Sequence, residues 1–292
     1  MFVLVGIGLL FASILVGFIM DGGKIGALIQ PNELVIIGGA ALSSLLIANP
    51  FSMVMTILRS VLSLLKPSPF TRERYMELLK MLYDLFMMAR KEGLVALDKH
   101  VEHPEESEFF AQYPNFMANH HALLFLADTM KVIVTGTVAS HDLAEMMDID
   151  LETAHEELVQ PAHILAKLGD AMPGFGIVAA VLGVVVTMAA IGGPPEEIGH
   201  KVAAALVGTF MGILLAYGIF APLSAALEAR VRGESAYMAC IKCALLSFAR
   251  GDAPLTAVEF ARRNIEPSLR PSFTEMEQYV KNLGGEEQRL AA

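Results

Sequence analysis

Few side chains in this sequence are placed to take part in chemistry, and they lie in or beside long apolar stretches. Thr209 and Tyr217 are the main polar residues of one stretch, and Asp170 lies at the edge of another. A threonine hydroxyl in such a place either bonds to the backbone of its own helix or contacts a carboxyl group or the hydration water of an ion. Both interpretations of Thr209 stay open from the sequence alone.

Ionisable side chains are missing from the central parts of all the apolar stretches. A membrane protein that moves ions by itself usually carries such a group there, because these groups form the relay. If this protein couples to an ion flux, the sequence therefore predicts that a partner supplies the titrating group. The alternative, that no ion is involved, stays open at this point.

Three further patterns do not amount to a catalytic or metal site, and no enzyme is predicted. Cys240 and Cys243 have CxxC spacing, but a zinc site would need two more ligands. No phosphate-binding loop with its lysine occurs, so no nucleotide partner is expected. The net charge of −10 argues against a nucleic-acid binder, which needs basic surface. We expect no cofactor, only protons or sodium ions as transported species.

Hydrophobicity is concentrated in four blocks, although apolar residues make up only 54% of the 292 residues. Each block has about the length of a membrane-spanning helix, which needs about 20 apolar residues. The first block is expected to remain as a span and not to be cleaved as a signal peptide. The fold class predicted is an all-α integral membrane protein with four transmembrane helices, at residues 2–20, 34–51, 171–191 and 202–227.

Basic residues predict the side of the membrane on which each segment lies. Ten Lys and Arg residues fall in 52–167 and nine in 228–292, against one in each short loop between spans. By the positive-inside rule, the long middle segment and both termini are cytoplasmic. The chain is therefore divided into four parts: spans 1 and 2 (1–51), an interfacial helix with a helical cytoplasmic domain (52–167), spans 3 and 4 (168–227), and a helical cytoplasmic tail (228–292).

The two cytoplasmic parts are predicted to be helical throughout. Polar residues share one face over 52–65, as in a helix that lies at the membrane surface. Ser272 and Glu275 form a capping box that begins a last short helix, and residues 284–292 are expected to be frayed. Further helices are predicted at 73–90, ending at Gly93, at 115–134 and at 142–168, the last with a kink at Pro161.

Spans 3 and 4 carry stripes of small residues and one proline each. Small residues let two helices approach closely, either within one subunit or against a partner. Pro173 and Pro222 lie near the cytoplasmic ends of the spans, where a static kink and a flexing gate both fit. The stripes consist of Gly176, Ala179, Ala180 and Gly183 in span 3, and of Ala204, Gly208, Gly212 and Ala216 in span 4.

Two longer motifs resemble the MotA stator proteins of the bacterial flagellar motor, in the MotA/TolQ/ExbB superfamily. They are GDAMPGFGIVAAV at residues 169–181 and VGTFMGILLAYG at residues 207–218. The shorter stretches HPEESE at 103–108 and AVEFAR at 257–262 also resemble this family. The resemblance covers nearly the whole chain, including the four spans, the long middle segment and the helical tail.

This resemblance implies a ring of five subunits in the bacterial inner membrane around a dimer of MotB, whose single span brings the missing Asp. Ion flux would then drive rotation through contacts with the rotor protein FliG, and the resemblance favours protons over sodium ions without deciding between them. An ExbB- or TolQ-like energiser of outer-membrane processes is a rival, but it would have three spans and an outside N-terminus. A self-sufficient channel or carrier is a second rival, and it would conduct ions without any partner.

The resemblance also implies roles for individual residues. Pro173 and Pro222, with Asp170, would couple proton transfer to movement of the cytoplasmic domain. Arg90 would contact FliG together with Asp98 and Asp150, and Asp98 stands where the family typically has Glu, so its reach is one methylene shorter. The ion path and the face toward MotB are expected to comprise Gly176, Ala180, Thr209, Gly212 and Tyr217.

Overall fold

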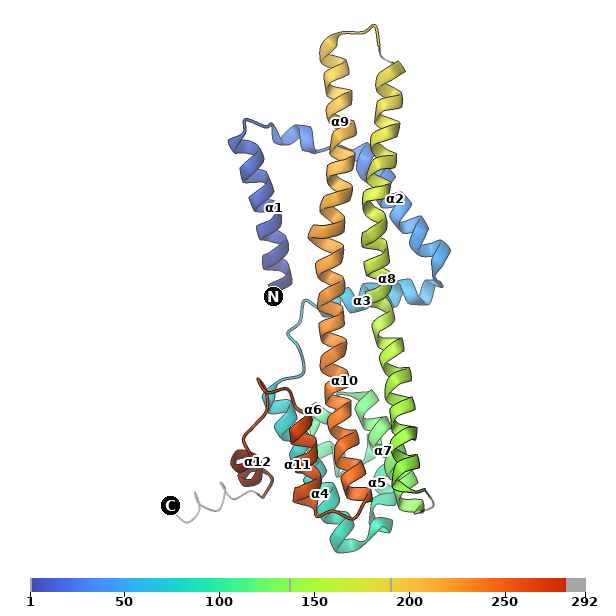
Figure 1. Cartoon of the computed structure of the whole chain (residues 1–292), viewed down its shortest axis with the longest axis vertical. Coiled ribbons are helices and arrows are strands. Elements are labelled where there is room, and N and C mark those ends of the chain that lie inside the picture. The colour runs from blue at the N-terminus through green and yellow to red at the C-terminus, as the bar shows by residue number, and fades with distance from the viewer. Residues whose placement is uncertain (1, 137, 190, 282–292) are drawn as a thin grey trace. The chain divides into compact units, whose positions relative to one another are not determined.

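The computed structural model describes residues 2–136, 138–189 and 191–281, and these residues form helices and no strand (Figure 1). The chain divides into two compact units. The first consists of Met1–Pro67 and Leu158–Arg230, and the second of Ser68–Glu157 and Val231–Ala292. The all-α class is therefore confirmed for the described residues, while the predicted fraying of residues 284–292 falls outside them.

The first unit contains the apolar helices. Four helical stretches are long and apolar enough to cross a membrane, namely Phe2–Met20, Ile25–Ala48, Ser140–Ala189 and Pro195–Ala249. The predicted spans coincide with these stretches apart from their ends. The helices are α1 (Phe2–Met20), α2 (Pro31–Ala48), α3 (Phe51–Ser63), the last part of α8 (Ser140–Ala189), α9 (Pro195–Ile213), a π-helical segment (Leu214–Phe220) and the beginning of α10 (Ala221–Ala249).

Two helices that the sequence predicts separately, at 142–168 and in span 3, are one helix in the structure. Helix α8 runs from Ser140 to Ala189 with Pro161 and Pro173 inside it. A proline removes one helix hydrogen bond but does not end the helix when neighbouring helices support it. Such support is present, because Ala162 and Leu165 of α8 pack with Ile57 of α3 and Leu227 of α10.

Glycines bring the backbones of α8 and α9 into close contact. A Cβ atom at Gly176 would lie 2.8 Å from the carbonyl oxygen of Gly208, and a Cβ atom at Gly212 would lie 2.7 Å from the carbonyl oxygen of Met172. The obstructing atoms belong to the backbone, so they cannot turn aside as the end of a side chain can. The small residues therefore hold two helices of one subunit together, which is the first of the two interpretations of the stripes.

Helix α3 is tied to α10 by a polar contact. Arg230 donates from Nη1 to the carbonyl oxygen of Ser63 at 2.5 Å, and Ser63 is the last residue of α3. A cation at this place satisfies a carbonyl group that has no partner within its own helix. The helix predicted at 52–65 is thus present, and its end is fixed to the helix that continues span 4.

The second unit is built around α4 (Arg72–Glu92), whose buried face includes Leu78, Leu82 and Phe86. Gly93, with φ of 87°, ends α4 as predicted. The single helix predicted at 115–134 is divided, because Asn119 accepts a hydrogen bond from the backbone of Ala122 and begins a new helix. The other helices are α5 (Asp98–Glu102), α6 (Pro114–Met117), α7 (His120–Thr135), α11 (Pro254–Asn264) and α12 (Phe273–Val280), with the remainder of α8 and α10.

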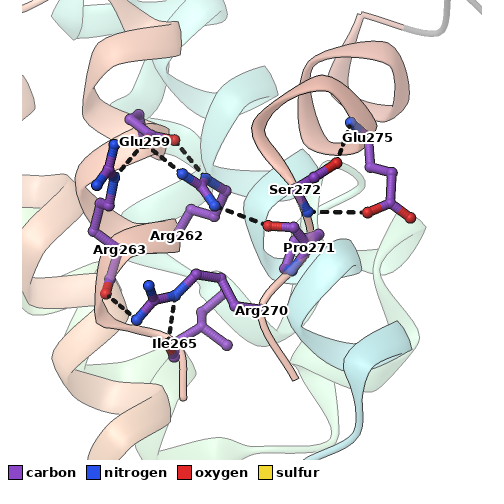
Figure 2. A network of polar contacts seen from close by, with 8 residues as sticks. All are labelled: Glu259, Arg262, Arg263, Ile265, Arg270, Pro271, Ser272 and Glu275. Carbon is purple, nitrogen blue, oxygen red and sulfur yellow. Dashed lines mark hydrogen bonds and ion pairs between the residues drawn. The ribbon is translucent and has the colours of Figure 1, made fainter. Parts of the chain in front are cut away.

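A polar network fixes the segment between α11 and α12 (Figure 2). Arg262 is buried, makes two hydrogen bonds to Glu259 and donates to the carbonyl oxygen of Pro271 at 2.8 Å. Hydrogen bonds from Arg262 hold the pKa of Glu259 below its usual value, so this acid is ionised near neutral pH. The predicted capping box of Ser272 and Glu275 is confirmed and begins α12.

The close contact of α8 and α9 leads to a prediction about two neighbouring glycines. Gly176→Ala would force the backbones apart and should lower the stability of the purified protein by about 1–3 kcal/mol, the usual effect of overpacking. Gly174→Ala is the matched control, because nothing lies within 4 Å of its added Cβ. Thermal unfolding in detergent would check this, and equal melting temperatures of the two variants would contradict the assigned contact.

Candidate functional site

Thr209 lies on α9 between the two glycines of the α8–α9 contact, and its side chain is half-buried. Among the described residues its hydroxyl group makes no hydrogen bond. Thr187 of α8 behaves differently, because its hydroxyl donates to the carbonyl oxygen of Gly183 at 2.8 Å. In the structure the Thr209 hydroxyl is therefore not bonded to the backbone of its own helix. The group is free to contact a carboxyl group or the water of an ion.

Tyr217 lies in the π-helical segment Leu214–Phe220, where the winding of the helix changes. The backbone N–H of Ala221 donates to the carbonyl oxygen of Ala216, five residues back, as in a π-helix. Pro222 follows directly, and a proline both lacks an N–H and presses its ring on the carbonyl of the residue four positions earlier. Single π turns inside α-helices are frequent at functional sites. This irregularity was not predicted, since the sequence shows only the proline.

Asp170 and Tyr217 line one open hollow of about 190 Å³ at the end of span 3, although the sequence suggested different roles for them. Glu228 of α10 lies on the same hollow, so two carboxyl groups face it. Both Asp170 and Tyr217 are exposed, Tyr217 by 69%. A hollow with two acids and no basic residue among its lining attracts cations.

The other small residues predicted for the ion path have different surroundings. Gly176 and Gly212 are buried against α9 and α8 respectively, so they already have a role inside the subunit. Ala180 is half-buried, and its backbone nitrogen would lie 3.3 Å from a Cβ atom at Gly208. That these residues also face a partner stays a prediction. Pro173 is half-buried inside α8, and Pro222 is exposed at the start of α10.

Arg90, Asp98 and Asp150, predicted for the rotor contact, are all exposed and belong to the second unit. The sequence suggested that Arg90 and Asp98 would share one face if they lay in one helix. They do not lie in one helix, because Gly93 ends α4 and the 3₁₀ turn Leu94–Leu97 precedes α5. Arg90 is in the last turn of α4, and Asp98 begins α5.

Glu33 is the residue that the sequence argument missed. Span 2 was expected to begin at residue 34, but α2 begins at Pro31, and Glu33 is buried within its first turn. Its side chain lies at Gly208, near the beginning of span 4. Among the described residues, the helices of the first unit therefore contain one buried carboxyl group. Pro31 was the available signal, because proline is common at the first position of a helix.

The CxxC pair forms no further site. Cys240 is buried and Cys243 half-buried, and neither forms a disulfide among the described residues. Burial raises the pKa of Cys240 to about 12, so its reactive thiolate form is scarce at neutral pH. The part of the chain that the structure describes holds no group of three His, Cys, Asp or Glu residues that could bind a metal ion.

Comparisons with known proteins agree with this arrangement of helices. The family described as "Motility protein A N-terminal" matches residues 4–93, and "MotA/TolQ/ExbB proton channel family" matches residues 118–239. The chain is 40% identical to Motility protein A of Salmonella typhimurium, over 96% of this chain and 95% of that protein. It is also 40% identical to Motility protein A of Escherichia coli, over 99% of this chain and 98% of that protein.

Two solved structures have a similar fold. A chain in the structure of C. jejuni MotAB matches with a TM-score of 0.73 and 22% identity, covering 91% of this chain and 95% of that one. A chain of the flagellar MotAB stator complex from Bacillus subtilis matches with a TM-score of 0.69 and 25% identity, covering 88% and 92%. With identities of 40% across almost the full length of two relatives, the chain belongs to the motility protein A family of the MotA/TolQ/ExbB superfamily.

Proposed function

We propose that this chain is the ring-forming stator subunit of a bacterial flagellar motor, and that with a MotB partner it forms a path for ions whose flux turns the rotor. The 40% identity with Motility protein A over nearly the whole chain carries this proposal. The match of residues 4–93 to the motility-specific N-terminal family favours it over an ExbB- or TolQ-like energiser. The chain is a multi-pass inner-membrane protein with four apolar helices.

The proposed arrangement places both termini and residues 52–167 and 228–292 in the cytoplasm. The distribution of Lys and Arg supports this orientation. Residues 1–51 and 168–227 then cross the membrane, and the short loops around Lys24 and Lys201 lie in the periplasm. Five copies would surround a MotB dimer, and their exposed apolar surface, which includes most of α1, would meet lipid or neighbouring subunits.

The ion step is proposed to occur where the partner's carboxyl group meets the faces of α8 and α9. The free hydroxyl of Thr209 supports this, because it can donate to that carboxylate or to the water of an arriving ion. Burying a charged carboxylate among these helices is costly, and a proton removes most of that cost. Protonation of the partner would therefore change which contacts with α8 and α9 are favourable, and the ring would advance.

The coupling of this step to the cytoplasmic part is proposed to pass through the proline-containing ends of spans 3 and 4. Pro173 lies inside α8, and Pro222 is the second residue of α10, one residue beyond the end of the π-helical segment. Both helices have lost regular hydrogen bonds there, so they bend at lower cost than a regular helix. Asp170 and Tyr217, which line the hollow beside this point, would respond to a passing cation.

The rotor contact is proposed to use exposed charge on the second unit. Arg90 would meet acidic residues of FliG, and Asp98 and Asp150 would meet basic ones. Contacts of this kind need charges of complementary sign more than tight packing. The shorter side chain of Asp98, compared with Glu, keeps the charge.

Replacement of Pro222 separates a functional from a structural role. In Pro222→Ala, residue 222 regains an N–H, so the segment can wind as a regular helix and should be stabilised by up to about 3 kcal/mol. We expect swimming to be lost in a strain that depends on this chain, while the melting temperature of the purified protein stays equal or rises. Pro195→Ala is the control, because Pro195 is the first residue of α9, where proline costs little. Normal swimming of Pro222→Ala would contradict the coupling role.

Reversal of the charge at Arg90 tests the rotor end. Arg90→Glu would place like charges against FliG, which disfavours the contact, so swimming should fall strongly at normal protein level. Lys131→Glu is the control, because Lys131 is a half-buried base on α7 of the same unit that forms its ion pair among the described residues with Asp128. A FliG variant with the opposite charge reversal should restore swimming. Equal swimming of the Arg90 and Lys131 variants would remove Arg90 from the rotor contact.

A further inference from the structure

We infer that Glu33 is a proton-binding carboxyl group of the ring subunit itself, enclosed in a buried site between α2, α8 and α9. The site rests on the geometry of the first unit. Only its consequence for the motor rests on the proposed function. The partner's carboxyl group and Glu33 would then be two different proton sites, one on each kind of subunit.

The position of Glu33 is set by a glycine on the facing helix. The residue is 6% exposed, and its Oε2 atom is inaccessible to solvent and has no hydrogen-bond partner among the described residues. A Cβ atom at Gly208 would lie 2.7 Å from this Oε2. The carboxyl group thus occupies the space that any side chain at position 208 would need.

Helix α8 forms the other side of this buried site. The same Cβ position at Gly208 would lie 3.2 Å from the Cβ of Ala179 and 3.3 Å from the backbone nitrogen of Ala180. The carboxyl group is therefore enclosed where three helices meet, with small residues around it. The stripe of small residues has, at this one place, a polar group inserted into it.

The surrounding helices offer Glu33 no charge partner. Residues 31–48, 171–189 and 202–220 contain Glu33 and Tyr217 as their only titratable side chains. The charged residues at the beginning of α9 are at least seven positions, or about 10 Å, from Gly208 along the helix. They are Glu196, Glu197, His200 and Lys201, and Lys201 pairs with Glu197 at 2.9 Å. Lys24, before the 3₁₀ turn Ile25–Leu28 that packs on α9, forms no ion pair with Glu33 in the described structure.

An enclosed carboxyl group without a partner holds a proton. An isolated carboxylate in an apolar environment costs far more than a neutral carboxyl group, so the group takes up one proton from water when it is enclosed. A proton on Oε2 itself can leave only when water or another proton acceptor reaches that buried atom, which requires a local separation of α2 from α9. Proton binding at Glu33 is in this way linked to how closely α2 lies against α9.

The alternative is that Glu33 acts only as a spacer of the right shape. Glutamine has the same shape and cannot bind a proton, so Glu33→Gln distinguishes the two roles. Aspartate keeps the proton but is shorter by one methylene group. Gly208→Ala keeps Glu33 but places a methyl group in the space that its carboxyl group occupies.

The test is infrared spectroscopy of the chain purified with its one-span partner in lipid nanodiscs, titrated from alkaline to acidic buffer. We expect Glu33→Gln to lose one protonated-carboxyl band that the wild type shows, and Glu33→Asp to retain this band at a shifted position. Gly208→Ala should alter the pH at which the band appears. Glu197→Gln, which removes an exposed carboxylate of α9, should leave the band unchanged.

An unchanged carboxyl band in Glu33→Gln would overturn the inference, as would a band that follows Glu197 instead. If Glu33→Gln does not accumulate in the membrane, the shifted band of Glu33→Asp decides the question. The spectra do not depend on motor function. Failure of the wild-type chain to restore swimming would refute the proposed function alone, and loss of the band in Glu33→Gln would still establish the proton site.

Discussion

The direct contact between the backbones of α8 and α9 is the constraint on which the rest of the first unit depends. In a bilayer, helices gain nothing from hiding apolar side chains from lipid, so they associate through close packing. Gly176 and Gly212 allow that packing because backbone atoms occupy the places where their side chains would be, whereas at Gly208 the Glu33 carboxyl group occupies that place. Everything else in this unit is arranged around a helix pair whose separation cannot increase without losing the contact.

This contact decides which groups remain available for function. The glycines are buried in the contact between α8 and α9 of one subunit. The neighbouring Thr209, in contrast, has a hydroxyl group without a hydrogen bond among the described residues. Toward the other end of the pair, the π-helical segment and Pro222 interrupt the regular winding, and Asp170 and Tyr217 line a hollow at the same level. A rigid contact followed by an irregular, polar end is an arrangement in which a small change in charge can move a helix end without breaking the pair.

The sequence was sufficient for the four apolar helices, the presence of helix α3, the end of α4 at Gly93 and the capping box at Ser272, because each depends on local residue patterns. It was insufficient where tertiary contacts determine the boundaries or the winding of a helix. The joining of two predicted helices into α8 and the π turn before Pro222 are examples. Glu33 was missed because a boundary placed at residue 34 put it outside the span, and its enclosure depends on Gly208, a residue 175 positions later. Arg90 and Asp98 are exposed, as the sequence predicted, but the structure places them on two different helices and not on one.

The central claim is that these four helices do not move ions until a partner brings its own carboxyl group, since Glu33 is a single enclosed group and not a continuous path. The most direct measurement is proton flux into lipid vesicles that contain either this chain alone or this chain with its one-span partner, at equal protein content. The account predicts flux only with the partner, and loss of that flux when the partner's membrane Asp is replaced by Asn. Proton flux through vesicles that contain this chain alone would contradict it.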